Sequence, residues 1–202
     1  MKKFGIAAEG ITDQVTIEAI LCGFFDAELE DEVNYVQPKP NSDGGWKAVF
    51  NYLVSQDFRN DVLNHDYLII QIDTDCSFDF GVTHDNKTIE QLIIAVIDIL
   101  ILKINENCFG FYQDYQDKLI FAISVHSLEC WLLAHYGQIT VVDNCFDNLR
   151  KIKFDRNIQL TKKYSVYEKL SQVFLVKSNI EVVTQKSLSF DFFVQYLRNI
   201  NI

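Results

Sequence analysis

The stretch that most constrains the fold is an apolar run that ends abruptly on two carboxylates, Leu68-Ile69-Ile70-Gln71-Ile72-Asp73-Thr74-Asp75. A short isoleucine-rich run is typical of a strand that is buried on both faces, as in the middle of a parallel sheet. Side chains alternate along a strand, so Asp73 and Asp75 are expected on the same side at its end. Two like charges this close favour a hard divalent cation such as Mg²⁺ or Mn²⁺. The alternative is that both aspartates only cap a loop or the next helix.

Strand and helix patterns alternate along the first two thirds of the chain. We expect strands at residues 4–8, 33–36, 68–73 and 119–125, with helices at 12–24, 46–54 and 88–103 between them. This order predicts an α/β fold, with a mostly parallel sheet, right-handed crossovers and helices on both faces. The most apolar later stretch, residues 92–104, contains Asp98 and Lys103. It therefore predicts a buried helix rather than a membrane span.

Acidic residues fall at corresponding places after these strands. Glu9 follows the first strand, and Glu129 begins the helix after the fourth. Open α/β sheets bind ligands outside the carboxyl ends of their strands. Each acid taken alone could be a solvated surface residue. The shared placement of Glu9, Asp73, Asp75 and Glu129 predicts one common metal site.

A Gly-Gly turn at Gly44-Gly45 opens the helix that begins near Trp46. The N-terminus of a helix after such a turn can bind phosphate. The turn lacks the lysine spacing of a Walker motif, so a plain structural turn is the alternative.

Charge is divided unevenly along the 202 residues, whose net charge is −10. Residues 1–100 carry 18 acids and 6 bases, whereas residues 101–202 carry 10 acids and 12 bases. Nine of the bases lie between Arg150 and Lys186. An acidic half that holds a metal and a basic segment that faces a polyanion would suit a nucleic-acid ligand. Lys162 and Lys163 are the candidates for a positive group near a bound phosphate.

The five cysteines, Cys22, Cys76, Cys108, Cys130 and Cys145, are odd in number and show no C-x-x-C spacing. We therefore expect reduced thiols in a cytoplasmic protein rather than a zinc cage or a disulfide framework. The apolar start of the chain is broken at Glu9, which is too early for a signal peptide.

Three motifs resemble those of TOPRIM domains. Ala8-Glu9-Gly10-Ile11-Thr12-Asp13 is similar to the first motif, in which a glutamate follows the first strand, and Asp73-Thr74-Asp75 is similar to the Asp-x-Asp of the second. The segment Ser127 to Ala134 is similar to the E-x-W-L-L-A element of small stand-alone TOPRIM proteins of the OLD-like and RloB-like type. One departure concerns the topoisomerase and primase branches, which tend to add an Asp where this chain has Ser77; Asp79 comes later.

After Gly137 the alternation of strands and helices weakens, so we expect residues 137–202 to form a helical C-terminal extension. The resemblance implies a TOPRIM-like, Rossmann-like domain over residues 1–136, on which this extension packs. It implies Mg²⁺ or Mn²⁺ held by Glu9, Asp73, Asp75 and Glu129. It further implies phosphodiester cleavage of DNA or RNA, tRNA among the candidates, as a toxic effector of bacterial anti-phage defence. Lys163 would assist catalysis, Glu9 would be a metal ligand or general base, and Glu129 would bind a second metal or orient its water.

Two other functional classes stay open. One is a non-catalytic or regulatory subunit gated by a partner such as an ATPase, with homo-oligomers also possible. The other is a nucleotide-binding domain without hydrolysis, although G-x-G-x-x-G and Walker A motifs are absent from the sequence. In the C-terminal part we expect helices at 161–175 and 190–197 and a short strand at 180–183. The aromatic side chains of the last helix could stack on bases, but packing against the sheet is the expected role.

Overall fold

Four strands form one parallel sheet. The computed structural model describes residues 2–26, 29, 32–40, 42–137, 143–154 and 158–200. The strands are β1 (Phe4–Ala7), β2 (Val33–Gln37), β3 (Tyr67–Asp73) and β4 (Leu119–Ser124). Their order in the sheet is β2-β1-β3-β4, and every neighbouring pair is parallel. The predicted α/β class with a parallel sheet is confirmed, and the arrangement is consistent with a Rossmann-like fold.

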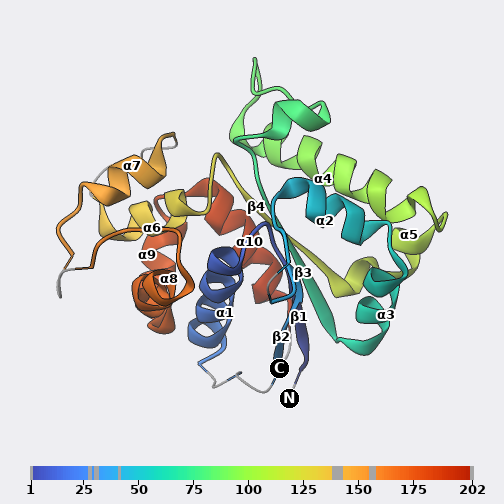
Figure 1. The fold of residues 1–202 in the computed structure, drawn as a ribbon, viewed down its shortest axis with the longest axis horizontal. Helices are drawn as coiled ribbons and strands as arrows, with labels where there is room; N and C mark the ends of the chain where they lie inside the picture. The colour runs from blue at the N-terminus through green and yellow to red at the C-terminus, as the bar shows by residue number, and fades with distance from the viewer. Residues whose placement is uncertain are drawn as a thin grey trace.

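Helices cover both faces of this sheet (Figure 1). On one side lie α2 (Trp46–Leu53), α3 (Gln56–Asn64), α4 (Ile89–Glu106) and α5 (Phe111–Tyr115). The other side carries α1 (Ile11–Phe25), α6 (Glu129–Tyr136), α7 (Cys145–Arg150), α8 (Tyr164–Ser171), α9 (Lys177–Thr184) and α10 (Leu188–Arg198). Three 3₁₀ turns complete the described elements: η1 (Ser77–Phe80), η2 (Gln116–Lys118) and η3 (Gln172–Leu175).

The middle strands are buried on both faces, as the isoleucine-rich run predicts. Ile69 belongs to the apolar core on the α1 side of the sheet, whereas Ile70 belongs to the core on the α2 and α4 side. Both side chains are fully buried. Alternate positions of β3 thus supply two separate cores, which is why the strand is apolar at nearly every position.

Helix α4 begins at a capping box in which Thr88 and Gln91 satisfy each other's backbone N–H groups. It buries one stripe of apolar side chains, Leu92, Val96 and Leu100 among them, in the core beneath it. Among the described residues, no helix combines the length and the apolarity needed to cross a membrane. The predicted helix is present, but only one face of it is buried, because Ile94 and Leu102 are exposed to solvent.

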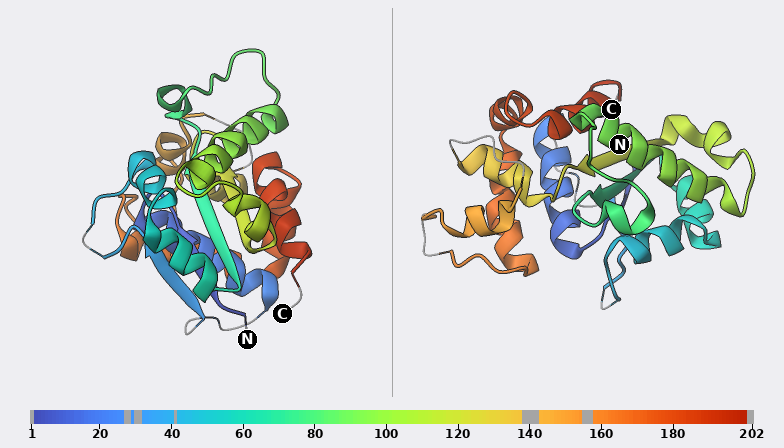
Figure 2. Two further views of the ribbon diagram at one scale, coloured as in Figure 1. Left: turned by 90° about the vertical axis from the view of Figure 1, so that its right-hand side faces the viewer. Right: turned by 90° about the horizontal axis from the view of Figure 1, so that it is seen from above.

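The C-terminal helices share a core with the first part of the chain. Helix α10 lies against the edge strand β4 and against α4 (Figure 2), and α8 packs on α1. Covering an edge strand in this way removes a site for unwanted strand pairing. Phe190 and Phe193 are fully buried and contact the Trp131 ring, so they pack rather than stack on bases.

Two predictions for the later part of the chain are wrong. Residues 180–183 form part of helix α9 and not a strand, because Ile180 and Val183 lie three residues apart on one buried helical face. Cys130 and Cys145 form a disulfide, with their Cα atoms 5.0 Å apart. Helix α7 folds back beside α6 and brings the two thiols together, which their separation of 15 residues does not reveal.

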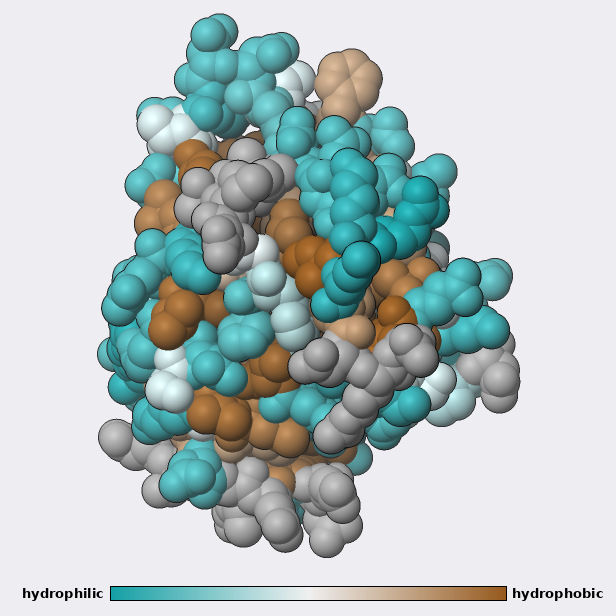
Figure 3. All heavy atoms as spheres, turned by 90° about the vertical axis from the view of Figure 1, so that its left-hand side faces the viewer, coloured by the Kyte–Doolittle hydropathy of each residue, from teal (hydrophilic) through white to brown (hydrophobic). Residues whose placement is uncertain are grey.

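The face formed by α6 to α9 is a mixture of hydrophilic and hydrophobic side chains (Figure 3). A cavity of about 760 Å³ opens there, with Tyr136, Phe154 and Val173 in its lining.

Candidate active site

The strand order fixes where a ligand would bind. From β1 the chain moves outward to β2, then crosses back to β3 on the other side of β1. Ligands of open α/β sheets bind at such a reversal, outside the carboxyl ends of the two strands. Glu9 lies two residues after the end of β1. Asp73 is the last residue of β3.

Glu9 and Asp73 are in direct contact at this point. The Asp73 backbone N–H donates to Glu9 Oε1 at 2.9 Å, and the Glu9 N–H donates to Gln71 Oε1 at 3.2 Å. Gln71 is fully buried and also donates from Nε2 to Asp73 Oδ1 at 2.7 Å. The buried amide of Gln71 therefore fixes both carboxylate-bearing residues relative to each other.

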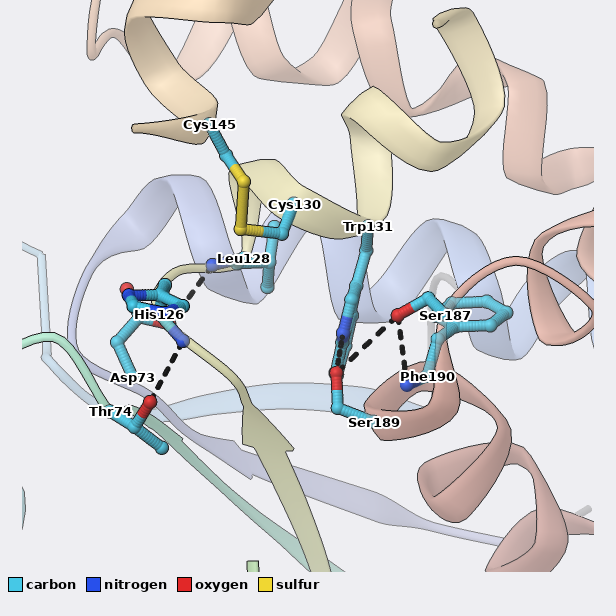
Figure 4. The surroundings of a disulfide bond; sticks show 10 residues. All are labelled: Asp73, Thr74, His126, Leu128, Cys130, Trp131, Cys145, Ser187, Ser189 and Phe190. Atoms are coloured by element: carbon cyan, nitrogen blue, oxygen red, sulfur yellow. Dashed lines mark hydrogen bonds between the residues drawn. A yellow bond between two sulfur atoms is a disulfide. The ribbon is translucent and has the colours of Figure 1, made fainter. Parts of the chain in front are cut away.

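Asp73 also joins β3 to the start of α6. Its Oδ1 accepts a hydrogen bond from the Leu128 N–H at 3.0 Å (Figure 4). Leu128 immediately precedes Glu129, the first residue of α6. This bond brings the glutamate of the third motif to the edge of the sheet where Asp73 lies.

Asp75 lies beyond the end of β3, in a turn, and is exposed. Its backbone N–H donates to the His126 carbonyl at 3.0 Å, and the preceding Thr74 accepts from the His126 N–H through Oγ1 at 2.8 Å. His126 has a positive φ of 64° and its ring contacts that of His84. The sequence pattern predicts that both aspartates lie on the same side of one continuous strand. Only Asp73 belongs to the strand, because β3 ends there and the chain turns at Thr74.

Asp13 joins the same group, although the sequence indicates only that it favours the start of a helix. Helix α1 begins after Gly10 and not at Thr12, so Asp13 occupies its third position. Its carboxylate accepts from the Gly10 backbone N–H, as a capping side chain does. Asp13 is 8% exposed and faces both Glu129 and Glu9.

Glu129 is buried and held from the C-terminal part of the chain. The Tyr167 hydroxyl, on α8, donates a hydrogen bond to Glu129 Oε1. The Lys162 ammonium lies 3.6 Å from the same oxygen, with its side chain 65% exposed. A buried carboxylate needs such partners, because an unpaired charge in the interior is costly. Lys162 and Tyr167 thus complete the site from residues far along the chain.

We refer to Glu9, Asp13, Asp73, Asp75 and Glu129 together as the acidic cluster. Burial raises the pKa of Glu9 to about 7, with Asp75 adding to the effect and the Asp73 N–H opposing it. Burial and the charges of Glu129 and Glu9 raise the pKa of Asp13 to about 8. The Asp73 pKa is raised well above its ordinary value by burial and by the other four carboxylates. Burial and mutual repulsion therefore favour the protonated forms of these carboxyl groups in the absence of a cation.

Lys162 offers a positive charge at the cluster. Burial lowers its pKa, but Glu129, Asp13, Asp73 and Asp75 together raise it above its ordinary value. Lys163 is exposed and precedes the first turn of α8. The structure thus brings Lys162 rather than Lys163 to the acids. Arg156, another base of this segment, lies outside the described residues.

The Gly-Gly turn packs directly on Glu9. A Cβ atom at Gly44 would lie 2.2 Å from the Glu9 carbonyl oxygen, and Gly45 has a φ of +89°. The Gly45 N–H donates to that carbonyl, and the Trp46 N–H donates to the Glu9 carboxylate. The N-terminus of α2 thus binds the side chain of Glu9. Phosphate binding at this turn stays a prediction.

The disulfide lies next to this site (Figure 4). Cys130 follows Glu129 in α6, and its bond to Cys145 attaches α7 to the first turn of that helix. Trp131, the next residue of α6, is fully buried. Its Nε1–H donates a hydrogen bond to Ser189 Oγ at 2.9 Å. The start of α6 is therefore fixed by Asp73, by the disulfide and by α10.

The donor chemistry of the cluster fits a hard divalent cation, since carboxylate oxygens are the ligands that Mg²⁺ and Mn²⁺ prefer. Burial, and after it the neighbouring carboxylates, raise the pKa values of Glu9, Asp13 and Asp73, and a bound cation would favour their charged forms. Within the described parts of the chain, no three Asp, Glu, His or Cys side chains are already arranged as ligands around one point. Binding of a cation would therefore require these side chains to rearrange.

Comparison with known proteins returns no match, either to family models, to curated proteins or to solved structures. The TOPRIM resemblance consequently depends on the motifs and on the place of their acids in the fold.

Proposed function

We propose that this protein is a TOPRIM-like, Mg²⁺- or Mn²⁺-dependent nuclease that cleaves phosphodiester bonds of DNA or RNA. The observation that supports it most is the acidic cluster at the strand reversal of a parallel sheet. Three separate motifs supply its members, Glu9 and Asp13 from the first, Asp73 and Asp75 from the second and Glu129 from the third. The toxic anti-phage role that the resemblance implies is part of the same proposal.

Asp73, Asp75 and Glu9 would hold the cation, with Glu129 as a further ligand or as the group that orients a water molecule. A bound divalent cation would offset the carboxylate charges and polarise the scissile phosphodiester. The protein's own part is to hold these groups in place. Gln71 and the backbone N–H groups of Asp73 and Trp46 orient Glu9.

Tyr167 and Lys162 act on the other side of the cluster. The Tyr167 hydroxyl holds Glu129 in one orientation, and Lys162 places a positive charge where the phosphate oxygens would approach. Since Lys162 is largely exposed, its ammonium can move from Glu129 to a substrate phosphate without unfolding any element. Of the two lysines that the sequence offers for this role, we propose Lys162.

A partner-gated subunit is the second candidate, and one observation favours it. The carboxylates of Asp73 and Glu129 already have internal partners, in Leu128 and Gln71 for the former and in Tyr167 and Lys162 for the latter. A protein partner such as an ATPase could control whether these internal bonds are released. Copurification of such a partner, and cleavage only in its presence, would distinguish this class from a nuclease that acts alone.

The test is to incubate the purified protein with DNA, tRNA and total RNA in Mg²⁺, in Mn²⁺ and in EDTA. We expect cleavage of at least one substrate with metal and none with EDTA. Asp75→Asn should abolish it, whereas the matched change Asp98→Asn, at an exposed position of α4, should leave it intact. Cleavage that survives EDTA or Asp75→Asn would exclude the proposed site.

A further inference from the structure

An aromatic groove includes Trp46, whose backbone N–H binds Glu9 of the acidic cluster. It is a cavity of about 630 Å³ between α2, η1 and α4, within the size range of small-molecule sites. Trp46 and Phe80 form one part of its wall, and Ile99 and Leu102 of α4 form another. Leu102 is 66% exposed, so the groove is open to solvent on the α4 side.

Three aromatic rings meet in this wall. The Trp46 and Phe80 ring centroids lie 5.4 Å apart, and each lies within 5.3 Å of the Phe50 ring. Phe50 is buried, whereas Trp46 and Phe80 are only half-buried. The buried ring thus fixes two neighbours that keep apolar surface in the groove. Such fixed, accessible rings are the surfaces on which unpaired bases stack.

The groove and the acidic cluster share their structural elements. The backbone N–H of Trp46 binds the Glu9 carboxylate, while the side chain of the same residue lines the groove. On the other wall, η1 starts two residues after Asp75 and contributes Phe80. If a phosphate of a nucleic-acid strand binds at the acidic cluster, we therefore expect a neighbouring base of that strand to lie near Trp46 and Phe80.

The charges of the groove favour a single base over a duplex. Lys47 lies 5.3 Å from the Trp46 ring centroid, and Lys103 pairs with Glu106 at the other end. Asp79 also lines the cavity, so cations and acids are balanced. A double helix needs a continuous positive surface for its phosphates, whereas a stacked base needs an aromatic face and few charges.

We propose that this groove binds an unpaired nucleobase of the strand to be cleaved, with the Trp46 ring as its stacking surface. This inference depends on the proposed nuclease function and narrows its substrate to single-stranded or locally unpaired nucleic acid. It also assigns Trp46 as a substrate-binding residue whose side chain and backbone serve two different parts of the site.

The test measures binding separately from cleavage. In an Asp73→Asn background, a short single-stranded oligonucleotide, its duplex and versions with single abasic positions are titrated against the protein in Mg²⁺. The chain has two tryptophans, and Trp131 is fully buried, so a change in fluorescence reports on Trp46. We expect the single strand to quench this fluorescence and to bind more tightly than the duplex.

Trp46→Ala should weaken binding of the single strand roughly tenfold or more, because stacking on one aromatic ring is worth that much. Trp46→Phe keeps an aromatic face and should retain most of the affinity. Phe109→Ala, at a fully exposed ring on another surface, is the matched control and should change nothing. An oligonucleotide with one abasic position should bind more weakly than the intact oligonucleotide to the protein that retains Trp46. The same abasic position should not weaken binding to the Trp46→Ala variant. The abasic oligonucleotides change only the ligand, so they test the groove even if the Trp46→Ala variant misfolds.

The proposal that the groove binds a base would be overturned by any of three results: no binding of the single strand, equal affinity for the duplex, or abasic positions that have no effect. Cleavage by the wild-type protein under those conditions would show that the nuclease function stands without it. Base-dependent binding without any cleavage would support the groove and reject the nuclease. Concentration-dependent dimers that Trp46→Ala abolishes would assign the groove to a second copy of the chain instead.

Discussion

The first and last parts of the chain contribute to the site in different ways. Residues 2–137 supply every carboxylate of the acidic cluster, each at or just after the end of a strand or at the start of a helix. Residues 143–200 supply groups that hold Glu129 and the start of α6, namely Lys162, Tyr167 and the disulfide-bonded Cys145. The difference shows that the C-terminal helices are part of the site as well as a cover for the edge strand.

The largest expected effect comes from Asp73→Asn. An asparagine Oδ1 can still accept the Leu128 and Gln71 hydrogen bonds, so the fold should survive. Removing one of several repelling charges should leave the metal-free melting temperature unchanged or raised. Cleavage should fall on the order of a hundredfold or more, because a lost metal ligand removes several kcal/mol of transition-state stabilisation. A destabilised variant that cleaves normally when folded would show that Asp73 is only structural.

Cys145→Ser tests whether the last part of the chain stabilises the first. A disulfide that closes a loop of about 15 residues contributes about 3 kcal/mol in the chain-entropy model, so the melting temperature should fall by about 6–12 °C. Reduction of the wild-type protein with dithiothreitol should have the same effect, measured by calorimetry. Cys108→Ser, at an exposed thiol outside the disulfide, is the control and should leave the melting temperature unaltered. A chain insensitive to both treatments would contradict the paired state of these cysteines.

The pH dependence of stability without metal tests the raised pKa values in the cluster. Glu9 and Asp13 have folded pKa values raised to about 7 and about 8. A raised carboxyl pKa means that the folded state binds the proton more tightly than the unfolded state does. The associated stability is therefore full below about pH 4 and is lost as pH rises through 7 to 8. We expect thermal denaturation in EDTA to show a melting temperature several degrees lower at pH 8 than at pH 5. Mg²⁺ should reduce that difference, and a profile that rises toward pH 8 would contradict the prediction.

The smallest effect separates two neighbouring lysines. Lys162→Ala removes the cation beside Glu129 and should lower cleavage several-fold and reduce the salt dependence of nucleic-acid binding. Lys163→Ala is the matched change at an exposed neighbour and should do neither. Binding and cleavage are measured at several salt concentrations. Equal behaviour of the two variants would remove Lys162 from the site.

Much of the fold follows from local patterns in the sequence. The apolar run before Asp73 predicts a doubly buried strand, and the pattern of residues 88–103 predicts helix α4, because both signals lie within consecutive residues. The strand ends also indicate where Glu9, Asp73 and Glu129 belong, since parallel strands present their carboxyl ends at one edge of a sheet.

The remaining features depend on contacts between distant residues. Tyr167 reaches Glu129 across 38 positions, and Cys145 reaches Cys130 across a loop that carries no spacing signal. In the sequence, Asp13 looks like an ordinary acidic residue in the first turn of a helix. Only the packing of α1 on the sheet places it beside Glu129. Ile180 and Val183 read equally well as strand or helix residues over so short a run, and tertiary packing decides for the helix.

The most direct test of the metal site is a crystal structure grown with Mn²⁺, with anomalous diffraction recorded at the manganese absorption edge. The account predicts an anomalous peak between Asp73, Asp75 and Glu9, with the Lys162 ammonium displaced from Glu129. Crystals of the Asp73→Asn variant grown in the same way should lack that peak. A wild-type crystal that shows no manganese at the acidic cluster, or shows it only at other carboxylates, would contradict the central claim.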